Sequence, residues 1–232
     1  MPDGEYEAIE EIHEANAMLE TSRDGAGATS FRHSIIGFKM RRLDGRSILQ
    51  SRINGFTDSR LRPYDQWESF RDEAKLAWAS YRAATLPAVI SRLAVRYINR
   101  IHLPNSLIEL DDFFATTPSI APELPQRFGG FFMQLQIPFD EVSGTAMINQ
   151  TIVPPNTEDT VSVVLDIDLF RDHDVPQTED SIWECLEQLH RAENRVFEAS
   201  ITEATRRLIE PLRVAWPSLI GQALKYADNS TS

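Results

Sequence analysis

The chain has 232 residues, of which 42% are hydrophobic and 25% are charged, a composition typical of globular rather than disordered proteins. No apolar run approaches the roughly 20 residues that a membrane-spanning helix requires, and the acidic amino end does not resemble a signal peptide. The single cysteine, Cys185, excludes an internal disulfide, so we expect a cytoplasmic protein without membrane association.

The net charge of −12 argues against a protein that wraps around nucleic acid, but this charge is unevenly distributed. Residues 31–104 carry 14 basic and 6 acidic side chains, whereas residues 1–30 and 105–232 are acidic. Of the 23 basic residues, 20 are arginine, whose planar guanidinium suits paired and partly buried positions. The basic segment can therefore bind an anion or be neutralised within the chain.

The amino-terminal part of the chain predicts a helix, a linker and a hairpin. Residues 1–20 have apolar side chains near helical spacing and predict a helix, and the small residues up to position 30 predict a linker. Residues 31–43 and 47–61 have the composition of two strands. Asp44-Gly45 between them is typical of a tight hairpin turn, because both residue types tolerate positive φ.

The clearest helix is predicted for residues 65–86. Asp65 is placed to cap it, Glu68 follows three positions later as in a capping box, and Pro87 ends it. The β-branched and aromatic side chains of residues 91–103 then predict a strand. A helix is the alternative for this segment, because its arginines also recur every four residues.

The second half predicts a short helix, a proline-rich crossing, and three strands over residues 128–137, 144–153 and 161–170. A long helix follows from Ser181 to about Ala199, after which a second Ser-x-x-Glu signature either continues or restarts it.

These elements predict an α+β fold with a mainly antiparallel sheet and long amphipathic helices on one of its faces. Strands followed by one long helix occur twice, which is a weak two-fold internal pseudo-repeat of architecture. The expected organisation is an amino-terminal helix and linker over residues 1–30, a single α+β domain over 31–210, and a carboxy-terminal extension with a disordered tail over 211–232.

Five landmarks resemble a sporadically distributed family of uncharacterised bacterial proteins: ILQSRINGFTDSRLRPYDQWESFRDEA, RLAVRYINRIHLP, FFMQLQIP, LDIDLF and FEASIT. The resemblance spans about residues 36–209 and implies a genomic context of defence or toxin–antitoxin-like gene pairs rather than a mechanism. Members usually begin with a hydrophobic strand ahead of the first helix. This chain lacks that pattern, and the open sheet edge left behind could form an edge-strand dimer.

The predicted strand over residues 91–103 suggests a binding site. Arg92, Arg96 and Arg100 share one face of it, opposite the apolar side chains, and could bind phosphate, carboxylate or an RNA backbone. The interpretation that we prefer is pairing with acids on another strand, because exposed charges on sheets are usually solvated or paired. Asp166 and Asp168 are the candidates, since they also share one face.

Asp166 and Asp168 also form a D-x-D pattern that could hold Mg²⁺ or Mn²⁺, with Asp172, His173 and Asp174 close by in sequence. This pattern is short and frequent by chance, so the metal site is the less favoured interpretation. The sequence contains no P-loop or dinucleotide-binding fingerprint, and we expect no cofactor. Cys185 lies among apolar residues and is predicted to be a small core residue rather than a nucleophile.

Three functions remain open from the sequence, and the absence of a catalytic motif favours a non-enzymatic one. The preferred function is a binding or regulatory module that acts through a protein partner encoded nearby. Its basic contact surface would contain Arg52, Arg60, Arg62, Arg92, Arg96 and Arg100. The alternatives are an enzyme that handles metal or phosphate with Asp166 and Asp168, and nucleic-acid binding by the basic hairpin of residues 31–62.

Overall fold

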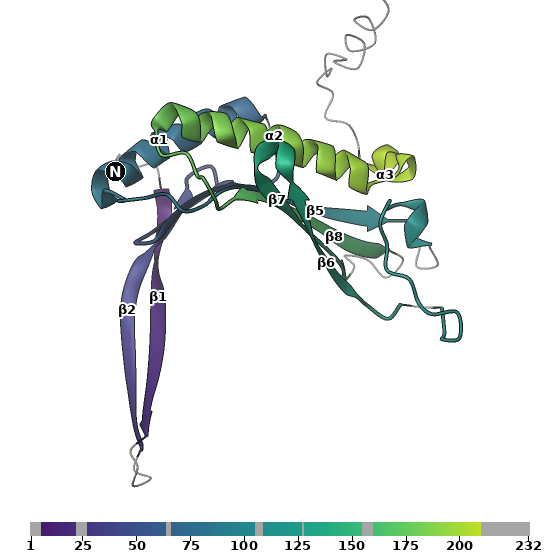
Figure 1. The fold of residues 1–232 in the computed structure, drawn as a ribbon, viewed down its shortest axis with the longest axis horizontal. Helices are drawn as coiled ribbons and strands as arrows, with labels where there is room; N and C mark the ends of the chain where they lie inside the picture. Colours follow the sequence, from purple (N-terminus) through teal and green to yellow (C-terminus); the bar gives the residue numbers. More distant parts are fainter. Residues whose placement is uncertain are drawn as a thin grey trace, which may run out of the picture. The chain divides into compact units, whose positions relative to one another are not determined.

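The computed structural model describes residues 6–21, 27–63, 66–104, 109–126, 128–154 and 160–209. The chain divides into two compact units, residues 1–88 and 89–232, where a single domain over 31–210 was expected. The α+β class is confirmed, because two four-stranded antiparallel sheets are combined with helices (Figure 1). None of the helices in the described segments is long and apolar enough to cross a membrane.

The first unit contains a meander of four strands, β1 (Tyr6–Thr21), β2 (Gly27–Arg42), β3 (Ser47–Arg52) and β4 (Gly55–Arg60), which are neighbours in that order. Strand β3 pairs with β2 only over Gly37–Arg41, whereas β1 pairs with β2 along its whole length. The outer parts of β1 and β2 therefore form a two-stranded arm that projects beyond β3 and β4 (Figure 1).

The helix predicted for residues 1–20 is wrong, because Tyr6–Thr21 forms strand β1. This acidic strand pairs with the basic strand β2, and the Lys39 ammonium donates a hydrogen bond of 3.1 Å to Glu10. The helix preference of residues such as Glu, Ala and Leu is worth less than about 1 kcal/mol per residue. Cross-strand pairing, which the spacing of apolar residues does not reveal, outweighs that preference here.

The turn predicted at Asp44-Gly45 is confirmed. Gly45 has a φ of 67°, and its N–H donates to the Arg42 carbonyl at 2.9 Å. The single strand predicted over residues 47–61 is instead a second hairpin, in which β3 and β4 are joined by a turn at residues 53–54. Asn54-Gly55 is a turn signal of the same kind as Asp44-Gly45 and marks this second reversal.

Helix α1 (Trp67–Thr85) lies where the sequence predicts it and packs against β4. Its cap position is Gln66, while the predicted cap, Asp65, lies outside the described residues. The Phe56 ring of β4 lies 5.6 Å from the Trp78 ring and 5.4 Å from the Tyr81 ring of α1. These aromatic contacts hold the helix on the sheet of the first unit.

The second unit contains β5 (Leu93–Leu103), β6 (Phe132–Phe139), β7 (Gly144–Val153) and β8 (Val161–Arg171), with the spatial order β5-β8-β7-β6. Strands β5, β7 and β8 lie within two residues of their predicted ranges, β6 begins four residues later than the predicted 128–137, and the helical alternative for β5 is wrong. The predicted short helix is a single 3₁₀ turn, η1 (Leu110–Asp112), and a second turn, η2 (Asp140–Val142), joins β6 to β7.

Helix α2 (Glu179–Ser200) packs on one face of this sheet, mainly over β5 and β8 (Figure 1). The helix stops at Ser200, Ile201 forms a β-bridge with Phe114, and α3 (Glu203–Leu208) restarts the helical path. The core between α2 and β8 consists of apolar side chains: Val163, Leu165, Ile167, Leu169, Ile182, Cys185, Leu189, Ala192 and Val196. The extension predicted for residues 211–232 lies outside the described residues.

Candidate functional site

The sheet of the second unit has an arginine-bearing face on the side opposite α2. Side chains of β5 alternate as predicted, with Leu93, Val95 and Ile101 buried, while Arg96 and Ile98 are exposed. We call this side the open face and define it by its polar and exposed members: Arg92, Arg96, Ile98, Arg100, Phe132, Gln134, Asn149, Asp166 and Asp168. It is the strongest candidate site, because it brings together predicted site residues from two strands, β5 and β8, that are far apart in the sequence.

The aspartates of β8 hold the arginines of the open face. The Arg96 guanidinium donates two hydrogen bonds to the Asp166 carboxylate, from Nε at 2.7 Å and from Nη2 at 2.6 Å. Arg92 donates from Nη2 to Asp168 at 2.8 Å, and its guanidinium carbon lies 4.4 Å from the centroid of the Phe170 ring. The preferred interpretation, pairing across strands, therefore describes both arginines.

The two partners in each pair differ in their exposure. The side chains of Arg92 and Arg96 are 45% and 52% exposed, whereas those of Asp168 and Asp166 are only 16% and 10% exposed. The hydrogen bonds that Arg96 donates to Asp166 raise the pKa of Arg96 further above its ordinary value. Each guanidinium is thus held by a nearly buried carboxylate, while about half of the arginine side chain remains exposed to solvent.

The polar contacts continue across all four strands of the sheet. Asn149 of β7 donates to Asp166 at 3.3 Å, and Gln134 of β6 donates to Asn149 at 2.7 Å. The resulting chain of side chains, Gln134–Asn149–Asp166–Arg96, crosses the sheet from one edge to the other. Sequence reasoning missed Asn149 and Gln134, although both stand at alternating positions of predicted strands and could have been assigned to this face.

Arg100 does not join the aspartate pairs. Its Nη2 donates to the carbonyl of Pro154 at 2.6 Å, beyond the end of β7. His102, the next residue on this face of β5, contacts the Ser162 hydroxyl at 2.9 Å through Nδ1. Of the three predicted arginines, Arg92 and Arg96 therefore bind these aspartates, and Arg100 binds the Pro154 carbonyl.

The same contacts bear on the metal interpretation of Asp166 and Asp168. Both oxygens of Asp166 accept hydrogen bonds and Asp168 Oδ2 accepts from Arg92, so that three of the four carboxylate oxygens bind an arginine, while Asp168 Oδ1 is buried with no partner among the described residues. In the described parts of the chain, no group of three or more histidine, cysteine, aspartate or glutamate residues could hold a metal ion. His173 contacts Asp172, its sequence neighbour, at 3.2 Å.

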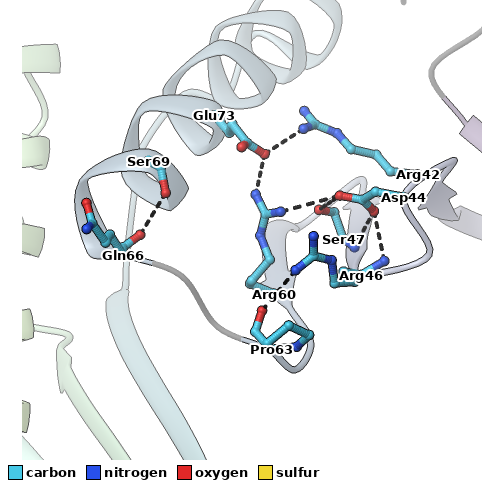
Figure 2. A network of polar contacts seen from close by, with 9 residues as sticks. All are labelled: Arg42, Asp44, Arg46, Ser47, Arg60, Pro63, Gln66, Ser69 and Glu73. Carbon is cyan, nitrogen blue, oxygen red and sulfur yellow. Dashed lines mark hydrogen bonds and ion pairs between the residues drawn. The ribbon is translucent and has the colours of Figure 1, made fainter. Parts of the chain in front are cut away.

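The arginines of the predicted basic hairpin lie in the first unit, where acidic residues bind several of them. Glu73 of α1 accepts hydrogen bonds from Arg42, at 2.6 Å, and from Arg60 (Figure 2). Arg60 also reaches Asp44 in the β2–β3 turn at 3.4 Å, and its side chain is only 10% exposed. This cluster joins α1 to the sheet, and Glu73 is a member that sequence reasoning missed.

Asp58 of β4 interacts electrostatically with Arg42, Arg60 and Glu73 of this cluster. Burial raises the pKa of its carboxyl to about 6, although Arg42 and Arg60 act in the opposite direction. Of the other predicted hairpin residues, Arg52 donates to Gln50 at 3.0 Å, and Arg62 is exposed after the end of β4. The six predicted arginines thus belong to two different units, and the contacts within the first unit brace α1 against its sheet.

Buried polar atoms of the second unit that have no hydrogen-bond partner among the described residues include Oδ1 of Asp168 and atoms of Gln150 and Glu193. Both amide atoms of Gln150 on β7 lack one, and so does Oε1 of Glu193 on α2; each residue is 1% exposed. Burial raises the pKa of the Glu193 carboxyl to about 8. Burial likewise raises the pKa of the Cys185 thiol, in keeping with the predicted core position rather than a nucleophile.

Neither the known protein families, nor the curated proteins, nor the solved structures include a match to this chain. The resemblance to the sporadically distributed bacterial family therefore stays a prediction, and the arguments that follow depend on the geometry of the chain itself.

Proposed function

We propose that the protein is a cytoplasmic, non-enzymatic binding module that contacts a protein partner through the open face of the second unit. The observation that supports this proposal is the pair of half-exposed arginines, each held in place by a nearly buried aspartate. A guanidinium that is already ordered loses less conformational entropy when a partner binds it. Arginine is also enriched among the residues that dominate binding energy in protein interfaces.

Exposed apolar side chains beside the arginines support a protein rather than a small anion as the partner. Ile98, between Arg96 and Arg100 on β5, is 64% exposed, and Phe132 on β6 is 68% exposed. Interfaces between proteins combine such apolar anchors with arginines and a polar surround. We expect the complementary surface to present apolar side chains together with carboxylates that accept the remaining N–H groups of Arg92 and Arg96.

The alternatives have less support from the same contacts. A metal- or phosphate-handling enzyme would need Asp166, Asp168 or the arginines to be available, and these groups bind one another. Nucleic-acid binding by the hairpin would need its bases to face phosphates, whereas Lys39, Arg42 and Arg60 each pair with an acid of the first unit. Both alternatives would require these pairs to open.

The test measures binding to the products of the flanking genes, a choice that the family resemblance supports. Each product is purified and titrated by calorimetry against the wild-type chain, Ile98→Glu and Leu76→Glu. Leu76 is 73% exposed on α1 of the first unit and provides the matched control. We expect one product to bind, Ile98→Glu to weaken its binding at least tenfold, and Leu76→Glu to leave it unchanged. Equal binding by all three chains, or binding of no flanking product, would contradict the proposal.

A further inference from the structure

Within the described segments the two sheets have four edge strands, and one of them differs from the others in charge. Strands β1, β4 and β5 each contain charged residues, among them Glu10, Asp58 and Arg96. Strand β6, Phe132–Phe139, has the sequence FMQLQIPF and contains none. Charged side chains on an edge prevent it from pairing with other chains, so β6 is the edge that lacks this protection.

The geometry of β6 is that of a strand ready to pair. Its register with β7 runs from Phe132↔Thr151 to Phe139↔Gly144 without a bulge, and within the described residues β7 is its only neighbour. Pro138 is the single residue that weakens the edge, and it stands near the end of the strand. An uncharged, regular and exposed edge of this kind is expected to be covered by another strand.

The sequence of β6 identifies the covering strand. Read outward from Leu135, its residues match in chemistry: Gln134 with Gln136, Met133 with Ile137, and Phe132 with Pro138. An antiparallel pair of identical strands related by a two-fold axis places these residues opposite one another. We infer that β6 binds β6 of a second copy of the chain in antiparallel register, with the two-fold axis at Leu135.

In this register, side chains of similar chemistry stand opposite one another on both faces of the extended sheet. Gln134 and Gln136 are exposed on the open face. Gln134 of one copy would stand opposite Gln136 of the other, so that their side-chain amides can exchange hydrogen bonds. Met133, Leu135 and Ile137 point to the other face, where they line a hollow together with Ile148 and Leu165. Ile137 is still 42% exposed there, and Met133 of the second copy would cover it.

The resulting dimer contains one continuous sheet of eight strands and has no further free β6 edge, so the assembly closes at two copies. This inference is argued from the free edge and the sequence of β6 and not from the proposed partner, although Phe132 and Gln134 of this strand also belong to the open face. Dimerisation would repeat the open face twice on one sheet.

The first test combines two double variants that change the same residues. In Gln134→Lys/Gln136→Lys, every lysine stands opposite another lysine, and like charges directly opposite destabilise a strand pair. In Gln134→Lys/Gln136→Glu, every lysine stands opposite a glutamate. By light scattering after size exclusion, we expect the wild-type chain and the lysine–glutamate variant at twice the 26.4 kDa of one chain. We expect the lysine–lysine variant at the mass of one chain.

The second test locates the two-fold axis. The one native cysteine, Cys185, is buried, so an introduced thiol reports on its own position. Leu135→Cys would face itself across the axis and form an intermolecular disulfide under mild oxidation. Phe132→Cys is the control, because two such residues would be about 20 Å apart along the strand direction.

Three outcomes would overturn the inference. They are a wild-type chain that is monomeric at 100 µM, a lysine–lysine variant that stays dimeric, or cross-linking of Phe132→Cys as fast as Leu135→Cys. The first would mean that β6 is free or is covered within its own chain, and the other two would mean that the dimer uses another surface or register. Circular dichroism of the lysine–glutamate variant checks that the changes at positions 134 and 136 leave the fold intact.

Discussion

Arg96 and Asp166 are joined by two hydrogen bonds, of 2.7 and 2.6 Å, between strands that are 70 residues apart in the sequence. Asp166 is nearly buried, and Asn149 is its other described donor. The arginine side chain on this face of β5 is therefore hydrogen-bonded to the neighbouring strand β8. Its energetic contribution and its availability to a partner can be tested separately.

The first prediction concerns this pair. Arg96→Ala leaves the Asp166 carboxylate buried with a weaker set of donors, and we expect a loss of about 1–3 kcal/mol in the free energy of unfolding. Arg96→Met/Asp166→Leu removes both charges and should recover most of that loss. Urea denaturation measures each value, with Arg191→Ala as the control, since the side chain of Arg191 is 71% exposed and its ion pair with Glu187 lies within one helix at i, i+4 spacing. A stability of Arg96→Ala equal to wild type would show that the pair contributes nothing to the fold.

The second prediction concerns pH and Glu193. Its pKa is about 8 in the folded chain against an ordinary value of 4.5, so the folded state keeps a proton that the unfolded state loses above about pH 5. The free energy of unfolding should therefore fall by about 1.4 kcal/mol per pH unit between pH 5 and pH 8 on account of this group. Glu193→Gln cannot titrate, and the difference between the two stability curves should show this slope. Parallel curves for wild type and Glu193→Gln would contradict the assignment.

The third prediction concerns Gln150. Its buried amide has no partner among the described residues, and a buried polar group without partners costs about 1–3 kcal/mol. Gln150→Leu should therefore raise the free energy of unfolding by about 1 kcal/mol. Gln188→Leu, at an exposed position of α2, should change it by no more than about 0.5 kcal/mol. A destabilised Gln150→Leu chain would instead indicate that the amide makes contacts that a leucine cannot replace.

The fourth prediction concerns the first unit. Glu73 accepts from both Arg42 and Arg60, so Glu73→Gln removes the charge that attaches α1 to the sheet. We expect a loss of about 1–2 kcal/mol in the free energy of unfolding, because charge-assisted hydrogen bonds are stronger than neutral ones. Glu68→Gln, exposed in the first turn of α1, serves as the control. Hydrogen exchange in α1 should increase for Glu73→Gln and stay unchanged for the control.

Much of the second unit could be predicted from the sequence. The alternation in β5, β7 and β8 is strong and identifies the apolar face of the sheet, on which α2 packs with its own apolar stripe. Asp166 and Asp168 were correctly named as partners of Arg92 and Arg96, but not of Arg100, because alternate positions on a strand share a face. The helix predicted for residues 1–20 was wrong, because this segment contains good helix formers and is a strand only because β2 lies beside it.

By itself, the sequence determined the α+β class, the arginine face of β5 and the uncharged character of β6, because these follow from composition and from the two-residue period of the backbone. Only the tertiary structure decided which strands are neighbours. It placed β5 beside β8 and left β6 at the edge, it divided the arginines between two units, and it positioned Glu73 against Arg42 and Arg60. The physical reason is that the side-chain period of a strand is a local property, whereas its partners depend on contacts between segments far apart in the chain.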